Sequence, residues 1–126
     1  MRAVSEPEGD MSVTDVLARQ GLATEESRYG TVRVVHSGAD LEAWSIWKDD
    51  EEVEPALAVM DRDDMLYVIQ GSLRLELEGG ETRVVSAGQL YVIPADTPFR
   101  GYRWPRDGEP CLFLAVAPAG ASFKRL

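Results

Sequence analysis

Residues 63–75, with the sequence DDMLYVIQGSLRL, contain the strongest structural signal in this chain. Residues 65–69 (MLYVI) are apolar without alternation, which is typical of a strand covered on both faces. Residues 73–78 (LRLELE) instead alternate apolar and charged side chains, so this strand is predicted to have one buried and one exposed face. Gly79 and Gly80 follow, and because glycine tolerates positive φ they predict a tight hairpin.

The rest of the chain continues this β pattern. Short runs rich in β-forming residues recur, separated by Gly, Pro and Asp, and no helical pattern lies between them, so we predict a sandwich or a closed barrel. The predicted strands are residues 31–36, 41–47, 56–60, 64–70, 73–78, 82–85, 90–94, 99–104 and 111–117. One short helix is expected earlier, over residues 15–20, with Ser12 or Thr14 as its N-cap and Gly21 ending it.

Length and composition favour one domain. The 126 residues are 44% apolar, and we divide them into a flexible leader over 1–11 and a single domain over 12–126. The acidic leader has no apolar run, and no segment approaches the roughly 20 apolar residues of a membrane span, so a cytoplasmic location is expected. The formal charge of −9 argues against nucleic acid and anionic membranes as partners. Cys111, the single cysteine, lies in an apolar run and is predicted to be a core residue.

Two segments resemble the conserved motifs of the cupin superfamily. Residues 63–71 resemble the end of the first motif, in which two histidines, a glutamate and a glycine follow at fixed spacing. Residues 88–99 (GQLYVIPADTPF) resemble the second motif, a glycine, a proline and a turn followed by a histidine. The resemblance covers roughly residues 30–118. It implies an all-β, cupin-type double-stranded β-helix, or jelly-roll barrel, preceded here by the short N-terminal helix.

The metal positions of the family are occupied by other residues in this chain. The resemblance places Ala58, Met60 and Phe99 where cupins have histidines, and Asp64 where they have the glutamate. A register one residue earlier gives Leu57 and Val59 in place of the first two, which are no better as ligands. The usual cupin metal needs three nitrogen ligands and a carboxylate, and only a carboxylate remains. We therefore expect no metal and no other cofactor.

A small-molecule ligand inside the barrel is then the expected partner. The predicted ligand-binding residues are Ala58, Met60, Asp64, Tyr91, Phe99 and Arg103. Strand alternation puts Arg103 on the same face as Phe99. Asp64 and Arg103 are thus predicted to form either a buried structural pair or a pair that transfers protons and holds an anion.

The remaining polar candidates have structural interpretations. His36, the single histidine, ends a predicted strand and is expected at the surface. Asp61 and Asp63 are expected in a solvated turn with Arg62, although an oxygen site for a hard cation is the alternative. The acidic residues 49–54 are expected in an exposed loop. Trp44 and Trp47 have opposite parity on one strand, so only one of them can face the interior, while aromatic residues at a barrel mouth can grip a flat ligand.

Two classes of function agree with these features. The first is a metal-independent cupin that binds a small organic ligand in its barrel. The second is a metal-free isomerase, epimerase or cyclase that uses Asp64, a tyrosine and Arg103. A ligand-sensing domain that acts through another protein and a purely structural dimer are further alternatives. A homodimer is expected, because the domain is small and the strand over residues 65–69 needs cover on both faces.

Overall fold

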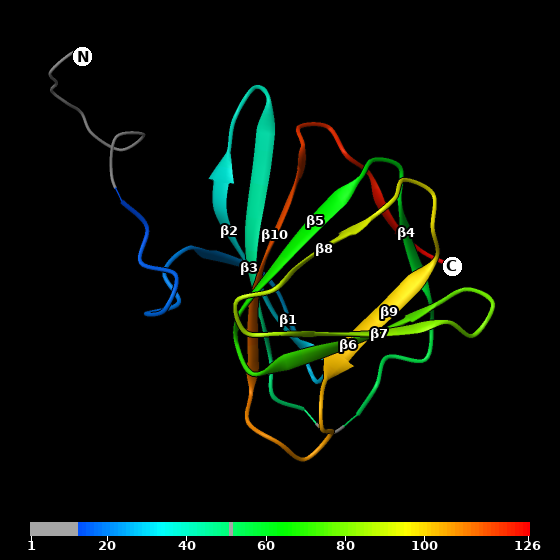
Figure 1. The fold of residues 1–126 in the computed structure, drawn as a ribbon. Coiled ribbons are helices and arrows are strands. Elements are labelled where there is room, and N and C mark those ends of the chain that lie inside the picture. Colours follow the sequence, from blue (N-terminus) through cyan, green and yellow to red (C-terminus); the bar gives the residue numbers. More distant parts are fainter. Residues whose placement is uncertain (1–12, 51) are drawn as a thin grey trace, which may run out of the picture.

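The computed structural model describes residues 13–50 and 52–126, which form eleven strands in two sheets (Figure 1). The strands are β1 (Leu22–Ser27), β2 (Gly30–Ser37), β3 (Leu41–Lys48), β4 (Ala58–Met60), β5 (Asp64–Gln70), β6 (Ser72–Leu77), β7 (Thr82–Ser86), β8 (Leu90–Ile93), β9 (Phe99–Arg103), β10 (Cys111–Pro118) and β11 (Phe123–Arg125). All pairings between them are antiparallel. The all-β class predicted from the sequence is confirmed.

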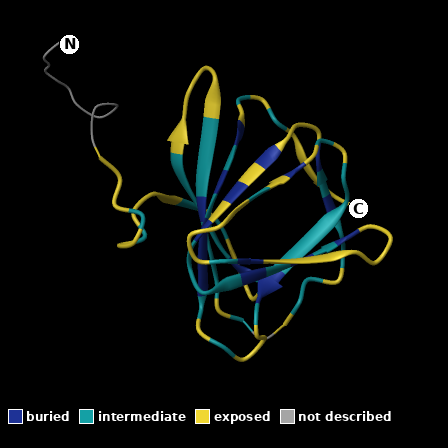
Figure 2. Cartoon of the chain, viewed as in Figure 1, coloured by how far each residue is buried: buried dark blue, intermediate teal, exposed yellow. Residues whose placement is uncertain are grey.

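The two sheets face each other and enclose the core. One sheet has the order β1-β2-β3-β10-β5-β8 and the other the order β11-β4-β9-β6-β7. Buried residues line the inner faces, whereas exposed residues are concentrated in the loops and on the outer faces (Figure 2). Leu66 and Val68 of β5 meet Leu73 and Leu75 of β6 and Phe113 of β10 in this core.

The stretch over residues 63–75 forms the junction between the sheets. β5 belongs to the six-stranded sheet and β6 to the five-stranded one, and the chain passes between them at Gly71. Gly71 has a φ of +73°, and a Cβ there would lie 2.5 Å from the carbonyl oxygen of Pro110. Only glycine fits this close approach without displacing the backbone. The predicted hairpin is also confirmed, since Gly79 and Gly80, both with a φ of +93°, connect β6 to β7.

The predicted N-terminal helix does not form. Residues 16–19 make a turn instead, in which the Asp15 carboxylate accepts a hydrogen bond from the Ala18 amide (3.1 Å) and Arg19 takes a positive φ of +59°. A single helical turn bears the full cost of nucleation, and Leu17 is exposed, so no buried apolar face offsets that cost. The predicted leader over 1–11 and the alternative cap Ser12 lie outside the described residues.

Two strands were not predicted. β1 has the polar sequence LATEES and β11 has only three residues, so neither carries a clear β pattern. β1 and β2 extend the six-stranded sheet sideways and do not form a second layer over β5. As a result, Met65 and Tyr67 of β5 point outward and are exposed.

Within the described residues, no helix is long and apolar enough to span a bilayer.

Candidate ligand-binding site

A cavity of about 300 Å³ lies between the two sheets. Its walls are mostly apolar and come from the inner faces of both sheets, with Trp44 and Ile46 on β3, Leu75 on β6, and Phe113 and Ala115 on β10. Trp44 therefore faces the interior and Trp47 lies outside, where the Arg19 guanidinium covers its ring at 4.3 Å. This division follows the alternation predicted for the strand.

Four of the predicted site residues meet at this cavity. Ala58, Met60, Asp64 and Phe99 all line it, and Ala58 is the direct register partner of Phe99 between β4 and β9. The alternative register residues Leu57 and Val59 are not among the residues that line the cavity in the described part of the chain. The three histidine positions of the family pattern thus lie on β4 and β9 of the five-stranded sheet, whereas Asp64 lies on β5 of the six-stranded sheet, and all four line the same cavity.

Asp64 is the charged group most deeply enclosed in this cavity. The residue is only 4% exposed, and in the described structure its Oδ1 atom has no hydrogen-bond partner. Burial raises the pKa of the Asp64 carboxyl from 3.8 to about 6, because the charged form loses its hydration. A carboxyl of this kind can donate or accept a proton near neutral pH, and its free oxygen can hydrogen-bond a ligand.

Arg103 and Tyr91, also predicted as site residues, are not among the described residues that line the cavity. Arg103 is buried and donates a hydrogen bond from Nη1 to the carbonyl oxygen of Gly108 (2.7 Å). Its register partner is Leu73, directly after the turn that ends β5, whereas Asp64 begins β5. Six residues of strand, roughly 20 Å, separate these levels. The alternation of side chains along β9 predicted the correct face for Arg103 but not its position along the barrel. No ion pair between Asp64 and Arg103 is formed in the described structure.

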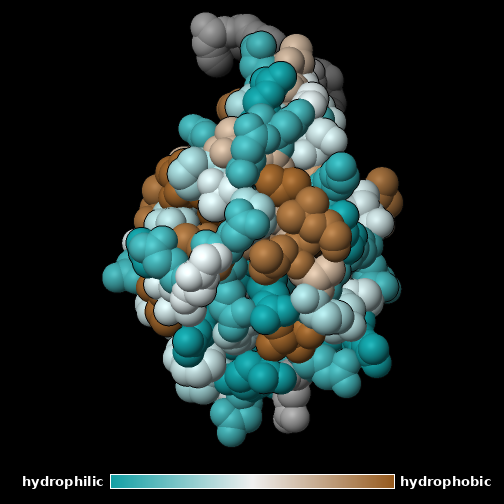
Figure 3. Space-filling view, turned by 90° about the vertical axis from the view of Figure 1, so that its right-hand side faces the viewer, coloured by the Kyte–Doolittle hydropathy of each residue, from teal (hydrophilic) through white to brown (hydrophobic). Residues whose placement is uncertain are grey.

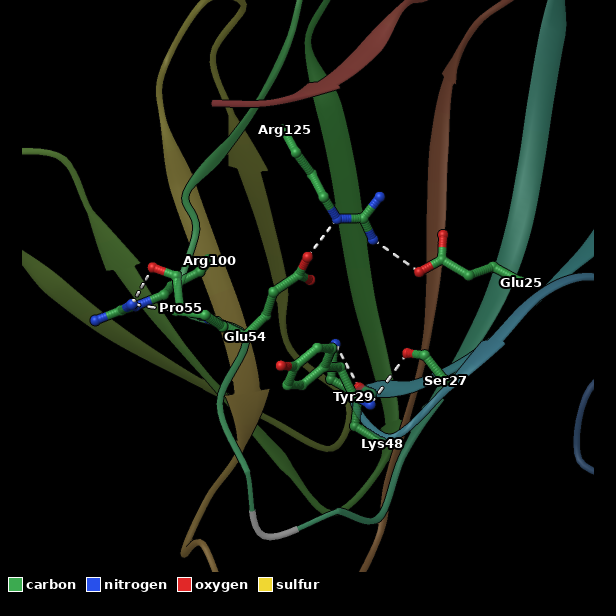
Figure 4. Close-up of polar contacts among 8 residues, drawn as sticks. All are labelled: Glu25, Ser27, Tyr29, Lys48, Glu54, Pro55, Arg100 and Arg125. Atoms are coloured by element: carbon green, nitrogen blue, oxygen red, sulfur yellow. Dashed lines mark hydrogen bonds and ion pairs between the residues drawn. The ribbon is translucent and has the colours of Figure 1, made fainter.

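An ion-paired cluster borders the cavity mouth (Figure 4). Arg125 of β11 pairs through Nη2 with Glu25 of β1 (2.7 Å) and through Nε with Glu54. β1 and β11 are the edge strands of the two sheets, so Arg125 spans the gap between them. Arg100 donates to the carbonyl oxygen of Pro55 (2.8 Å), which fixes the segment that carries Glu54.

Lys48 lines the same end of the cavity. It is half-buried at the end of β3, and its Nζ atom donates to the carbonyl oxygen of Tyr29 (3.1 Å; Figure 4). Burial lowers the pKa of Lys48, with Glu54 and Glu25 acting in the opposite direction. The ammonium is thus poorly hydrated, although it has further N–H donors available.

The sequence interpretation missed the polar residues of the mouth. Lys48 had a usable signal, because it has the same parity as Trp44 and Ile46 on one strand. Glu54 was assigned to an exposed acidic loop without chemistry. Arg125 had no signal, since its strand was not predicted and its two partners are distant in sequence.

The other polar candidates have structural roles. His36 is exposed at the end of β2, as predicted, and Cys111 is fully buried, where desolvation raises the pKa of its thiol to about 12. Asp61 and Asp63 accept hydrogen bonds from the amides of Ser122 (2.7 Å) and Ala95 (2.9 Å) and so tie loops together. No group of three or more His, Cys, Asp or Glu side chains that could hold a metal ion occurs among the described residues.

The comparisons with known proteins agree with the motifs and the geometry. The family model described as "Cupin domain" matches residues 60–117, which include β5 to β9, β10 up to Ala117, and Asp64. The chain is a member of the cupin superfamily. None of the curated proteins matches it.

Solved structures show the same cupin fold. KdgF from Halomonas sp. is 26% identical, with 76% of this chain and 85% of that chain covered and a TM-score of 0.60. An uncharacterized double-stranded β-helix protein from Klebsiella pneumoniae is 19% identical, with 90% and 95% covered and a TM-score of 0.73. The polyketide cyclase RemF from Streptomyces resistomycificus is 21% identical, with 98% and 86% covered and a TM-score of 0.67.

Proposed function

We propose that this cupin binds a small, largely apolar organic molecule in the cavity between its sheets, without a metal. The observation that carries the proposal is the cavity of about 300 Å³, whose apolar walls enclose one carboxyl, Asp64, with an unpartnered oxygen. A space of this size with few polar groups is typical of a small-molecule site. Asp64 would accept or donate one orienting hydrogen bond, while Phe99 and Met60 contact the apolar body.

A neutral bicyclic aromatic probe, 2-naphthol, tests this proposal. We expect saturable one-to-one binding to the wild-type protein in a calorimetric or fluorescence titration. Ala115→Phe adds a ring on the cavity wall and should weaken binding roughly tenfold or more, because the ring occupies the ligand's space. The added volume should cost about 1–3 kcal/mol of stability, so folding is checked by circular dichroism.

Val116→Phe is the matched control for this variant, since the next residue on β10 faces outward. Its affinity for 2-naphthol should equal that of the wild type. Unchanged affinity in folded Ala115→Phe, or an equal loss in both variants, would show that the probe does not bind between the sheets.

Asp64 also favours a second candidate function. A metal-free isomerase, epimerase or cyclase needs a group that exchanges protons near neutral pH, and the raised pKa of Asp64 meets that need. Among the described residues, the tyrosine that lines the cavity is Tyr29. Arg103 is engaged with Gly108, so the predicted pairing of Asp64 with Arg103 does not support this candidate.

We further propose a homodimer formed through the outer face of the six-stranded sheet. Met65 and Tyr67 of β5 and their register partners Val92 and Leu90 of β8 are all exposed there. Light scattering should give twice the chain mass at micromolar concentration, and Tyr67→Glu should shift it to one chain mass, because a buried unpaired charge is costly. Val84→Glu, on the exposed face of β7, should remain dimeric. A wild-type monomer at all concentrations would exclude this arrangement.

A cytoplasmic location remains a prediction from the sequence.

A further inference from the structure

We infer that Lys48 binds the anionic group of the ligand, so that the preferred ligand is an apolar or aromatic carboxylate. This inference rests on the proposed function, because it concerns the same cavity. It names the chemical class that the cavity selects and the residue that selects it.

The first support comes from the cations that line the cavity. The described structure has three of them, and two already pair with carboxylates of the protein. Arg125 pairs with Glu25 and Glu54, and Arg100 donates to a Glu76 carboxylate oxygen (2.8 Å) and to backbone carbonyls. Lys48 has no carboxylate within ion-pairing distance among the described residues and donates only to the neutral Tyr29 carbonyl. It is therefore the cavity cation with free donors.

The second support is the location of the ammonium relative to the apolar walls. The inner face of β3 presents Lys48, Ile46 and Trp44 to the cavity. Lys48 lies at the end of the strand, and the two apolar side chains follow it along the cavity wall. A ligand with a ring system against Trp44 and Ile46 places a terminal carboxylate at Lys48. Hydrogen bonds between ions are the strong ones, and they are strongest where water is excluded.

The charge at the mouth acts against an anion, but only weakly. Glu25, Arg125 and Glu54 together have a formal charge of −1, which opposes an incoming anion. These side chains are 41%, 43% and 25% exposed, so solvent screens much of their field. Lys48 is in direct contact with the ligand space, where screening is weaker.

The residues around Lys48 compensate its charge poorly, and its pKa, lowered by burial, agrees with this. An anion that pairs with the ammonium supplies the missing partner, as a salt-bridged lysine requires. At the other end, Asp64 lies five to six residues along β10 from the level of Lys48, roughly 17–20 Å, so its charge is distant from the anion site.

The experiment compares two probes of the same shape, 2-naphthoate and neutral 2-naphthol, on three proteins. The wild type should bind 2-naphthoate more tightly than 2-naphthol. Lys48→Met keeps the aliphatic stem but removes the charge, and should weaken 2-naphthoate binding roughly ten- to a hundredfold while changing 2-naphthol affinity less than about twofold. Lys124→Met is the matched control: Lys124 is exposed on β11 outside the cavity lining, and its loss changes the net charge equally.

Each outcome has one meaning. Selective loss of 2-naphthoate affinity in Lys48→Met, with Lys124→Met unchanged, supports the inference. Equal affinity of the wild type for both probes, or an equal loss of both in Lys48→Met, overturns the anion role but leaves the cavity proposal intact. Failure of the wild type to bind either probe overturns the proposed function and this inference with it.

Discussion

The unfolding free energy of the wild-type protein should fall, relative to that of Asp64→Asn, as the pH rises from 4 to 7.5. The folded-state pKa of Asp64 is about 6, against 3.8 for an unperturbed aspartate. Between these values the native state holds a proton that the unfolded state has released, so stability declines with increasing pH. Well below pH 3.8 both states are protonated and the effect vanishes. Above pH 6 the loss of stability approaches its full value. The difference between the two pKa values, about 6 and 3.8, corresponds to about 3 kcal/mol.

Asparagine at position 64 cannot ionise, so the variant lacks this pH dependence. It should be more stable than the wild type at pH 7.5 by up to about 3 kcal/mol, less whatever its buried amide loses without a partner. Urea denaturation at pH 4, 5, 6 and 7.5 measures the difference between the two proteins at each pH. Asp107→Asn, an exposed aspartate, is the control and should follow the wild-type curve. A pH-independent difference between wild type and Asp64→Asn would mean that Asp64 is not buried as an ionisable group.

The sequence predicted the strands whose side chains alternate or are wholly apolar, and it missed the others. β5 and β6 were predicted because a buried inner face demands a regular apolar pattern over six or seven residues. β1 carries LATEES, in which backbone pairing with β2 suffices without an apolar face. The N-terminal helix failed for the opposite reason, because its local capping signals were present but no tertiary contact covered Leu17.

Candidate site residues, like strands, could be predicted where a local pattern indicates them and were missed where only tertiary contacts do. Ala58, Met60, Asp64 and Phe99 line one cavity, and the cupin motif could indicate them because it fixes their spacing within adjacent strands. That they bind a ligand remains a prediction. Arg103 was misplaced because alternation sets the face of a strand and not the level along it.

The ion pairs at the cavity mouth could not be predicted from the sequence for a related reason. Glu25 and Arg125 are 100 residues apart, and nothing local shows that their strands are the facing edges of two sheets. Such pairs follow from the closure of the barrel, which a single sequence does not reveal.

Restoring the histidines should create a metal site in this cupin. The side chains of Ala58, Met60 and Phe99 line one cavity with Asp64, so histidines at the three positions would supply three nitrogen ligands beside a carboxylate. That donor set binds zinc or nickel. Aspartate is one methylene shorter than the glutamate of the family pattern, so the variant that also contains Asp64→Glu should bind more tightly. Wild-type protein purified without chelator should contain no stoichiometric transition metal by elemental analysis.

The substitutions have a cost that the metal partly offsets. Met60→His and Phe99→His each remove apolar contacts and add a polar group, at about 1–3 kcal/mol each. Zinc binds the folded state selectively, so the melting temperature of the quadruple variant should rise with zinc concentration, whereas that of the wild type should not. Calorimetric titration measures the affinity directly.

The control places histidines at Leu57, Val59 and Phe99, a register shifted by one residue on β4. Because successive side chains on a strand point to opposite faces, the first two would face away from the cavity and from Phe99. This control should bind zinc no better than the wild type. A folded quadruple variant with no gain in affinity, or a control that exceeds it, would show that Ala58 and Met60 do not converge with Phe99 and Asp64 on one point. The cavity wall would then lack the geometry that other cupins use to hold a metal.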